Sequence, residues 1–153
     1  MQTGKSLKEN LFCNCMYFTA NSLARTIGKI ADEAFSETQL PPSYAFVLMT
    51  AIERPGINQK EIGCEMMLTP STITRFVDKL VAKGFLYRSQ DGKNMHIYPT
   101  EAGIALKPTI KTAQQRLYQK YTEVLGCETS KGLTQHMFEA IQQLEQTPQQ
   151  QQN

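Results

Sequence analysis

Hydroxyl and basic side chains recur between positions 71 and 79 of this chain, and side chains of these types can bind DNA. They are Ser71, Thr72, Thr74, Arg75 and Lys79. Small hydroxyl groups can hydrogen-bond to base edges, and cations placed behind them can contact phosphates. An ordinary solvated helix face has a similar composition, so the elements that hold these side chains must decide between the two interpretations.

The segment between Thr69 and Gly84 has the start, the periodicity and the end of a helix. Thr69 is a good N-cap, Pro70 suits the first helical position, and Leu68 can pack on Ile73. Gly84 stands where a left-handed C-terminal cap is expected. Apolar residues follow at helical spacing and predict one buried face: Ile73, Phe76, Val77, Leu80 and Val81. The hydroxyl and basic side chains then share the opposite face.

A shorter helix is expected before this one. Asn58 is its N-cap, Glu61 three residues on completes a capping box, and Ile57 can pack on Ile62. The shorter helix is predicted to end near Met66. The two helices would therefore be joined by a tight turn.

A β-hairpin is expected after the longer helix. Two strand-like runs, 85–89 and 95–98, flank the turn signal Asp91-Gly92. The order of two helices and a hairpin predicts a winged helix-turn-helix, which places one helix in the major groove of DNA. A wing of this shape can lay polar and basic groups along DNA, although a plain surface hairpin remains an alternative. Its candidate contacts are Lys93 and Asn94 at the tip and Arg88 at the base.

Long helical segments flank this module. They are predicted at 6–34, at 43–53, from Thr100 to Leu125 with a kink at Pro108, and at 131–146. The segment at 43–53 is apolar on nearly all sides and belongs in the core. The terminal helices have no obvious core within the chain, so we expect them to pack together and against a second copy.

The predicted fold class is mainly α with a small β-hairpin wing, a winged helix-turn-helix flanked by N- and C-terminal dimerisation helices. An N-terminal dimerisation helix and linker occupy 1–40, and the winged DNA-binding lobe occupies 41–100. C-terminal dimerisation helices occupy 101–146, and a glutamine-rich disordered tail occupies 147–153.

Composition narrows the function classes. Sixteen basic and fourteen acidic residues give a net charge of +2, so DNA binding would depend on placement and dimer symmetry rather than on bulk charge. No apolar run is long enough to span a membrane and no signal peptide is visible, so a cytoplasmic location is expected. No phosphate loop, catalytic constellation or metal-ligand cluster is visible, so we expect neither an enzyme nor a cofactor or metal site.

The pattern from Asn58 to Gly103 resembles the MarR family of bacterial transcription regulators. The matching stretches are NQKEIG, then TPSTITRFVDKLVAKGFLYR, then the hairpin, then TEAG. The resemblance implies a homodimer that binds a pseudo-palindromic double-stranded DNA operator, usually as a repressor. It also implies release by a small-molecule effector or by thiol oxidation.

Site residues follow from this resemblance. It places base contacts at Ser71, Thr72, Thr74 and Arg75, a backbone contact at Lys79, and phosphate contacts at Asn58 and Gln59. The family's wing usually carries an Asp-x-Arg stretch, whereas this wing has Asp91-Gly92-Lys93-Asn94 and no arginine at its tip. A minor-groove arginine is therefore not expected here, and Lys93 would contact phosphate.

The cysteines suggest a second kind of site. Cys13 and Tyr17 match the spacing of the thiol-based peroxide-sensing branch of the family, in which a tyrosine follows the reactive cysteine by four residues. On one helix Tyr17 could donate a hydrogen bond to the Cys13 thiolate. The alternative is that Cys13 is an inert, small apolar residue, and Cys15 is expected to pack in the core.

A ligand pocket and a different function also remain open. The family's crevice between the dimerisation helices and the winged lobe would here draw on aromatic and methionine side chains, which could equally be core: Tyr17, Tyr44, Phe46, Met49, Met66 and Met67. The alternative function is a winged-helix module that binds a protein partner and does not bind DNA, which the mild charge and the short wing favour.

Overall fold

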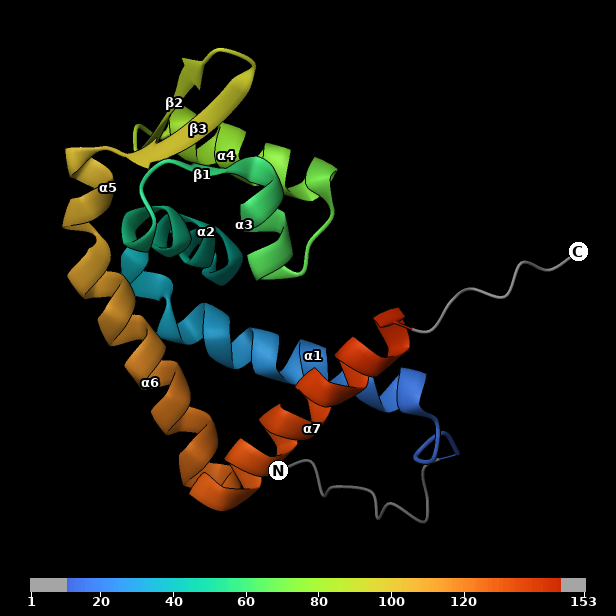
Figure 1. The fold of residues 1–153 in the computed structure, drawn as a ribbon. Coiled ribbons are helices and arrows are strands. Elements are labelled where there is room, and N and C mark those ends of the chain that lie inside the picture. Colours follow the sequence, from blue (N-terminus) through green and yellow to red (C-terminus); the bar gives the residue numbers. More distant parts are fainter. Residues whose placement is uncertain (1–10, 147–153) are drawn as a thin grey trace, which may run out of the picture. The chain divides into compact units, whose positions relative to one another are not determined.

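The fold is mainly helical with one small antiparallel sheet (Figure 1). A computed structural model describes residues 11–146, so the predicted helix start near Ser6 and the predicted disordered tail at 147–153 lie outside the described residues. The chain divides into two compact units, Met1–Leu117 and Tyr118–Asn153, and each is described by itself. The predicted fold class is confirmed.

Three helices form the centre of the first unit: α2 (Pro42–Glu53), α3 (Gln59–Met66) and α4 (Pro70–Ala82). Pro42 opens α2, and its apolar side chains lie in the core as predicted. The fully buried side chains join the three helices to the sheet: Val47, Leu48, Ile62, Ile73, Leu80, Leu86 and Ile97. Burial of each large aliphatic side chain contributes about 1.5–3 kcal/mol, so this core holds α4 firmly from one side.

The sheet has three strands, one more than predicted. Strands β2 (Leu86–Asp91) and β3 (Asn94–Pro99) form the wing, and β1 (Ile57–Asn58) pairs with the other edge of β3. Asp91 pairs with Asn94, so the wing turns through only Gly92 and Lys93, with Gly92 at φ +58°. A positive φ at the first turn residue favours glycine, which explains the sharp turn.

Helix α1 (Met16–Ala34) begins later than predicted. Leu11–Asn14 form turns, and Cys15 is an extended N-cap residue whose side chain makes no cap hydrogen bond. Cys15 is exposed, so the prediction that it packs in the core is wrong. Only Ala31 and Ala34 of α1 are buried, and a helix draws most of its stability from such packing. The 3-10 helix η2 (Ser36–Thr38) then leads to α2.

The predicted long helix after the wing is two helices, α5 (Glu101–Ala105) and α6 (Lys107–Leu125). Pro108 has no N–H for the carbonyl of Ile104, so the predicted kink becomes a break at Leu106. Thr100 caps α5 as predicted, by accepting from the Gly103 N–H at 3.1 Å. The Thr100 hydroxyl also donates to the Gly84 carbonyl at 2.6 Å and thereby ties α5 to the end of α4.

The second unit contains the end of α6 and helix α7 (Cys127–Gln146). Gly126, at φ +82°, follows the last residue of α6, and α7 begins at once rather than near Lys131. An apolar stripe on α7 is exposed: Leu133, Met137, Phe138, Ile141 and Leu144. Among residues 11–146, no helix is long and apolar enough to cross a membrane.

Candidate nucleic-acid interface

The N-terminus of α4 is closed by its own hydroxyl groups. Thr69 Oγ1 accepts from the Thr72 N–H at 3.4 Å and lies 2.8 Å from Thr72 Oγ1 and 3.3 Å from Ser71 Oγ. Pro70 occupies the first turn, where its missing N–H costs nothing. The predicted helix start is confirmed, and it carries three neighbouring hydroxyls.

The two faces of α4 differ as the sequence predicted. Ile73, Phe76, Val77 and Leu80 are buried, whereas the outer face is polar. Ser71, Thr74, Arg75 and Lys79 are exposed and Thr72 is half-buried. The Arg75 guanidinium lies 5.7 Å from the Phe76 ring centroid, a cation–π distance that restrains its side chain.

A polar network joins α3, α4 and the base of the wing. Gln59 Nε2 donates to Thr74 Oγ1 at 3.1 Å, and Gln59 Oε1 accepts from Arg88 Nε at 3.3 Å and Nη2 at 3.1 Å. Arg88 also forms an ion pair with Asp78. The ion pair is open to solvent on the Asp78 side and contributes only about 0–1 kcal/mol. Its main effect is therefore geometric, because it fixes where the wing leaves α4.

Asp78 is the member of this network that the predicted site omitted. It lies on the polar face of α4, ten residues before the only arginine of the wing. The opposite charges of Asp78 and Arg88 could have indicated this ion pair from the sequence. Whether the two side chains meet, however, depends on the register of β2. Arg88 and Gln59 therefore serve as braces in this structure, because the Gln59 amide and the Nε and Nη2 atoms of Arg88 are bound within the protein.

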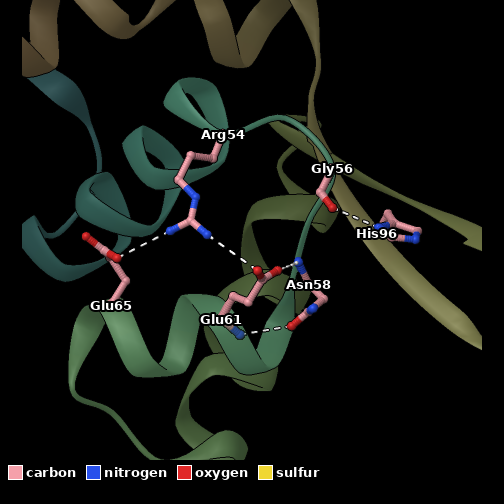
Figure 2. A network of polar contacts seen from close by, with 6 residues as sticks. All are labelled: Arg54, Gly56, Asn58, Glu61, Glu65 and His96. Atoms are coloured by element: carbon pink, nitrogen blue, oxygen red, sulfur yellow. Dashed lines mark hydrogen bonds and ion pairs between the residues drawn. The ribbon is translucent and has the colours of Figure 1, made fainter.

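Asn58 is likewise bound within the protein (Figure 2). Its Oδ1 accepts from the Glu61 N–H at 2.9 Å, and Glu61 Oε2 accepts from the Asn58 N–H at 3.0 Å, which confirms the predicted capping box. Arg54 pairs with Glu61 at 3.4 Å and with Glu65 at 3.3 Å. The first turn of α3 is thus braced from the end of α2.

The tip of the wing is open to solvent. Lys93 and Asn94 are both exposed there. The hairpin behind them is stiffened by Tyr87 and Tyr98, whose stacked rings lie 5.4 Å apart. His96 Nδ1 donates to the Gly56 carbonyl at 2.8 Å and holds β3 against the loop before β1 (Figure 2).

Several cations of the lobe have no anionic partner. Within the described part of the chain, Lys60, Lys79, Lys83 and Lys93 are exposed and form no ion pair. Lys60 and Lys83 were not among the predicted contacts, and they extend the exposed positive charge to α3 and to the end of α4. These lysines can supply phosphate contacts.

The structure does not bring Cys13 and Tyr17 together. Cys13 lies in the turn before α1, and its thiol is 3.7 Å from Asn14 Oδ1. Tyr17 is in the helix and its side chain is 79 % exposed. The premise that both lie one turn apart on one helix is wrong, because the helix begins only at Met16.

Three of the six predicted ligand residues share a groove. Phe46, Met49 and Met66 line an open groove of about 420 Å³, together with polar and charged side chains: Thr50, Glu53, Arg54, Glu65 and Gln114. Tyr44 instead packs on the Phe76 ring at 4.4 Å. Met67 and Tyr17 are exposed outside the groove. A hydrogen bond from Lys107 holds the pKa of Glu53 below its ordinary value.

The helix pair and hairpin define a winged helix-turn-helix. The family model that matches this chain, over residues 40–95, is that of the MarR family. The regulator SarZ of Staphylococcus haemolyticus is 33 % identical over 81 residues, which are 50 % of this chain and 55 % of SarZ. This chain spans about half the length of the curated relatives it matches.

Solved structures agree over a longer stretch. A MarR-family transcriptional regulator from Rhodococcus sp. RHA1 is 26 % identical, with a TM-score of 0.70 over 87 % of this chain and 95 % of that chain. The repressor CouR bound to a 23-mer DNA duplex has the same fold, at 18 % identity and a TM-score of 0.78, over 91 % of this chain and 99 % of CouR. Residues 40–95 are thus similar to the MarR family, and the fold is that of a solved MarR-family regulator.

Proposed function

We propose that this protein is a dimeric, sequence-specific DNA-binding transcriptional regulator, acting as a repressor in the cytoplasm. The observation that carries the proposal is the outer face of α4, where Ser71, Thr74 and Arg75 are exposed beside unpaired lysines. The named relatives are regulators, and CouR has been solved on DNA. An enzymatic activity is not part of the proposal.

In this proposal α4 enters the major groove with its N-terminus first. Ser71, Thr72, Thr74 and Arg75 would face base edges, and Lys79 the DNA backbone. Lys93 and Asn94 would contact phosphate or sugar from the wing. Asn58, Gln59 and Arg88 would act mainly by holding these elements, since their polar groups are already bound within the protein.

The exposed apolar stripe of α7 supports the dimer. Leu133, Met137, Phe138, Ile141 and Leu144 would be covered by a second copy, and domains 1–40 and 101–146 would supply the interface. A twofold axis would then place two α4 helices about one DNA turn apart, roughly 34–36 Å, on a pseudo-palindromic operator.

Release from DNA would use an effector in the groove beside Phe46, Met49 and Met66. CouR also has a structure with p-coumaroyl-CoA bound, which supports control by a small molecule. Thiol oxidation at Cys13 is the second route. Hydroperoxide should release DNA from the wild type and not from Cys13→Ser, and equal release from both would reject Cys13 as the sensor.

The test is a gel shift with the full chain on DNA flanking its own coding region. We expect a complex that prefers one sequence and weakens steeply as salt rises. Absence of any sequence-preferring complex would reject the proposal. Capture of one specific protein partner, with no DNA retained at low salt, would instead support the protein-interaction module.

A further inference from the structure

The Thr74 hydroxyl on the outer face of α4 makes two hydrogen bonds within the protein. Its proton is donated to the Pro70 carbonyl at 3.0 Å, and one of its lone pairs accepts from Gln59 Nε2 at 3.1 Å. A threonine hydroxyl has one proton and two lone pairs. A single lone pair, together with the γ-methyl group, therefore remains for a partner outside the protein.

Arg88 fixes the direction of this chain of hydrogen bonds. Two of its N–H donors, on Nε and Nη2, point at one end of the Gln59 amide, at 3.3 and 3.1 Å, and an N–H group can only donate. That end of the amide must be the oxygen, since a flipped amide would place donor against donor. The Gln59 NH₂ group then faces Thr74, and Asp78 holds Arg88 in place from the other side.

We propose that Thr74 is a specificity-determining residue that accepts a hydrogen bond from the exocyclic amino group of an adenine or a cytosine, and that Gln59 is the positioning residue that keeps it an acceptor. In the major groove only adenine N6 and cytosine N4 present amino donors, whereas guanine and thymine present acceptors at the corresponding positions. Phosphate offers only acceptors as well. The inference rests on the proposed function, since it assigns a base class to one contact of that site.

The test uses the full-length protein and an operator library in which each base pair is varied. For the wild type we expect one position in each half-site to prefer adenine or cytosine on the contacted strand by roughly tenfold. Replacing that adenine by purine, or that cytosine by pyrimidin-2-one, removes only the amino group and should cost the same factor.

Thr74→Val keeps the shape and the methyl group but removes the oxygen. We expect this variant to lose the preference at that one position, to keep it elsewhere, and to be indifferent to the amino-free bases. Thr74→Ser should retain the preference. Thr112→Val is the matched control, because the Thr112 hydroxyl makes the same bond to a proline carbonyl four residues back, at 3.1 Å, on α6.

Gln59→Met removes the amide but keeps the length of the side chain. The Thr74 hydroxyl is then free to turn, so guanine should become tolerated at the Thr74 position while the preferences at other positions stay. A uniform loss of affinity for all sequences would overturn the role of Gln59, because that is the effect of a merely structural residue.

The outcomes separate this inference from the proposed function. If the wild type prefers guanine or thymine at every position that Thr74→Val alters, or if Thr74→Val alters none, the assignment to Thr74 is wrong while the regulator proposal stands. If the wild type shows no sequence preference at all, both fail.

Discussion

The winged lobe and the C-terminal unit bury their apolar side chains in different ways. In the lobe, Leu48, Ile73 and Leu80 are completely buried within one chain. In α7, Leu133, Phe138 and Leu144 follow an equally regular pattern, yet all are exposed. The lobe can therefore present a fixed surface by itself, whereas the stripe of α7 is left open to solvent.

The same contrast applies to polar side chains. The lobe binds Gln59, Asp78 and Arg88 to one another and leaves Thr74 and Arg75 at the surface. Its rigidity therefore includes the face that would meet DNA.

The core of the lobe should be the more sensitive region. Leu48→Ala should lower the free energy of unfolding by about 2–5 kcal/mol, because it leaves a cavity in a completely buried site. Leu144, which is 68 % exposed, is the matched position, and Leu144→Ala should change that free energy by less than about 0.5 kcal/mol per chain. Urea denaturation followed by circular dichroism measures both. Equal losses would contradict the division.

Replacing a glycine by alanine should lower stability in the lobe and raise it in α7. A Cβ atom at Gly103 would lie 2.2 Å from the Phe85 carbonyl oxygen, so Gly103→Ala should destabilise the lobe by about 1–3 kcal/mol. A Cβ atom at Gly132 on α7 would meet nothing within 4 Å, and Gly132→Ala should stabilise its helix by about 0.5–1 kcal/mol. Thermal denaturation gives both signs, and a neutral Gly103→Ala would refute the close approach of α5 to Phe85, the residue before β2.

Removing an arginine should weaken DNA binding when it lies on the outer face of α4 and not when it lies on α6. Arg75→Ala should cost about 1–3 kcal/mol of operator binding and relax base preference, because Arg75 is exposed on the outer face of α4. Arg116 on α6 is the control, and its side chain pairs with Glu37 of η2 at 2.8 Å. Arg116→Ala should leave operator affinity unchanged. Fluorescence anisotropy across a salt series measures the affinities. An unchanged affinity for Arg75→Ala would remove it from the site.

The ion pair between Glu53 and Lys107, 2.8 Å long, should give the smallest effect. Lys107 lowers the pKa of Glu53 below its ordinary value of 4.5. The pair should therefore stabilise the fold at pH values above 4.5, and its contribution should be lost as the pH falls through the lowered pKa of Glu53. Glu53→Gln and Lys107→Gln should each remove this slope from the unfolding free energy. A slope retained by both variants would assign it to other groups.

The sequence predicted best the features that depend on neighbouring residues. The Thr69 cap, the Asn58–Glu61 capping box and the Gly84 helix end are all present, because each is decided within one helical turn. The missing N–H of Pro108 predicted a kink, and the structure has a break two residues earlier, at Leu106. The buried face of α4 followed from helical periodicity alone.

Features that depend on tertiary contacts were predicted less well. Strand β1 is two residues long and exists only because β3 offers it a free edge. The pairing of Arg88 with Asp78 needs the register of β2. Helix α1 begins at Met16, later than the sequence predicts, and both Cys15 and Tyr17 are exposed within the chain. The three side chains that share the groove come from α2 and α3, whose contact no local pattern encodes.

The central claim is that the outer face of α4 recognises a DNA sequence, and genomic footprinting with the purified full chain tests it most directly. We expect a small set of protected sites, each a pseudo-palindrome whose half-site centres lie about 10–10.5 base pairs apart. Arg75→Ala should lose these sites, whereas Arg116→Ala should keep them. Protection without any shared sequence, or the same sites retained by Arg75→Ala, would contradict the claim.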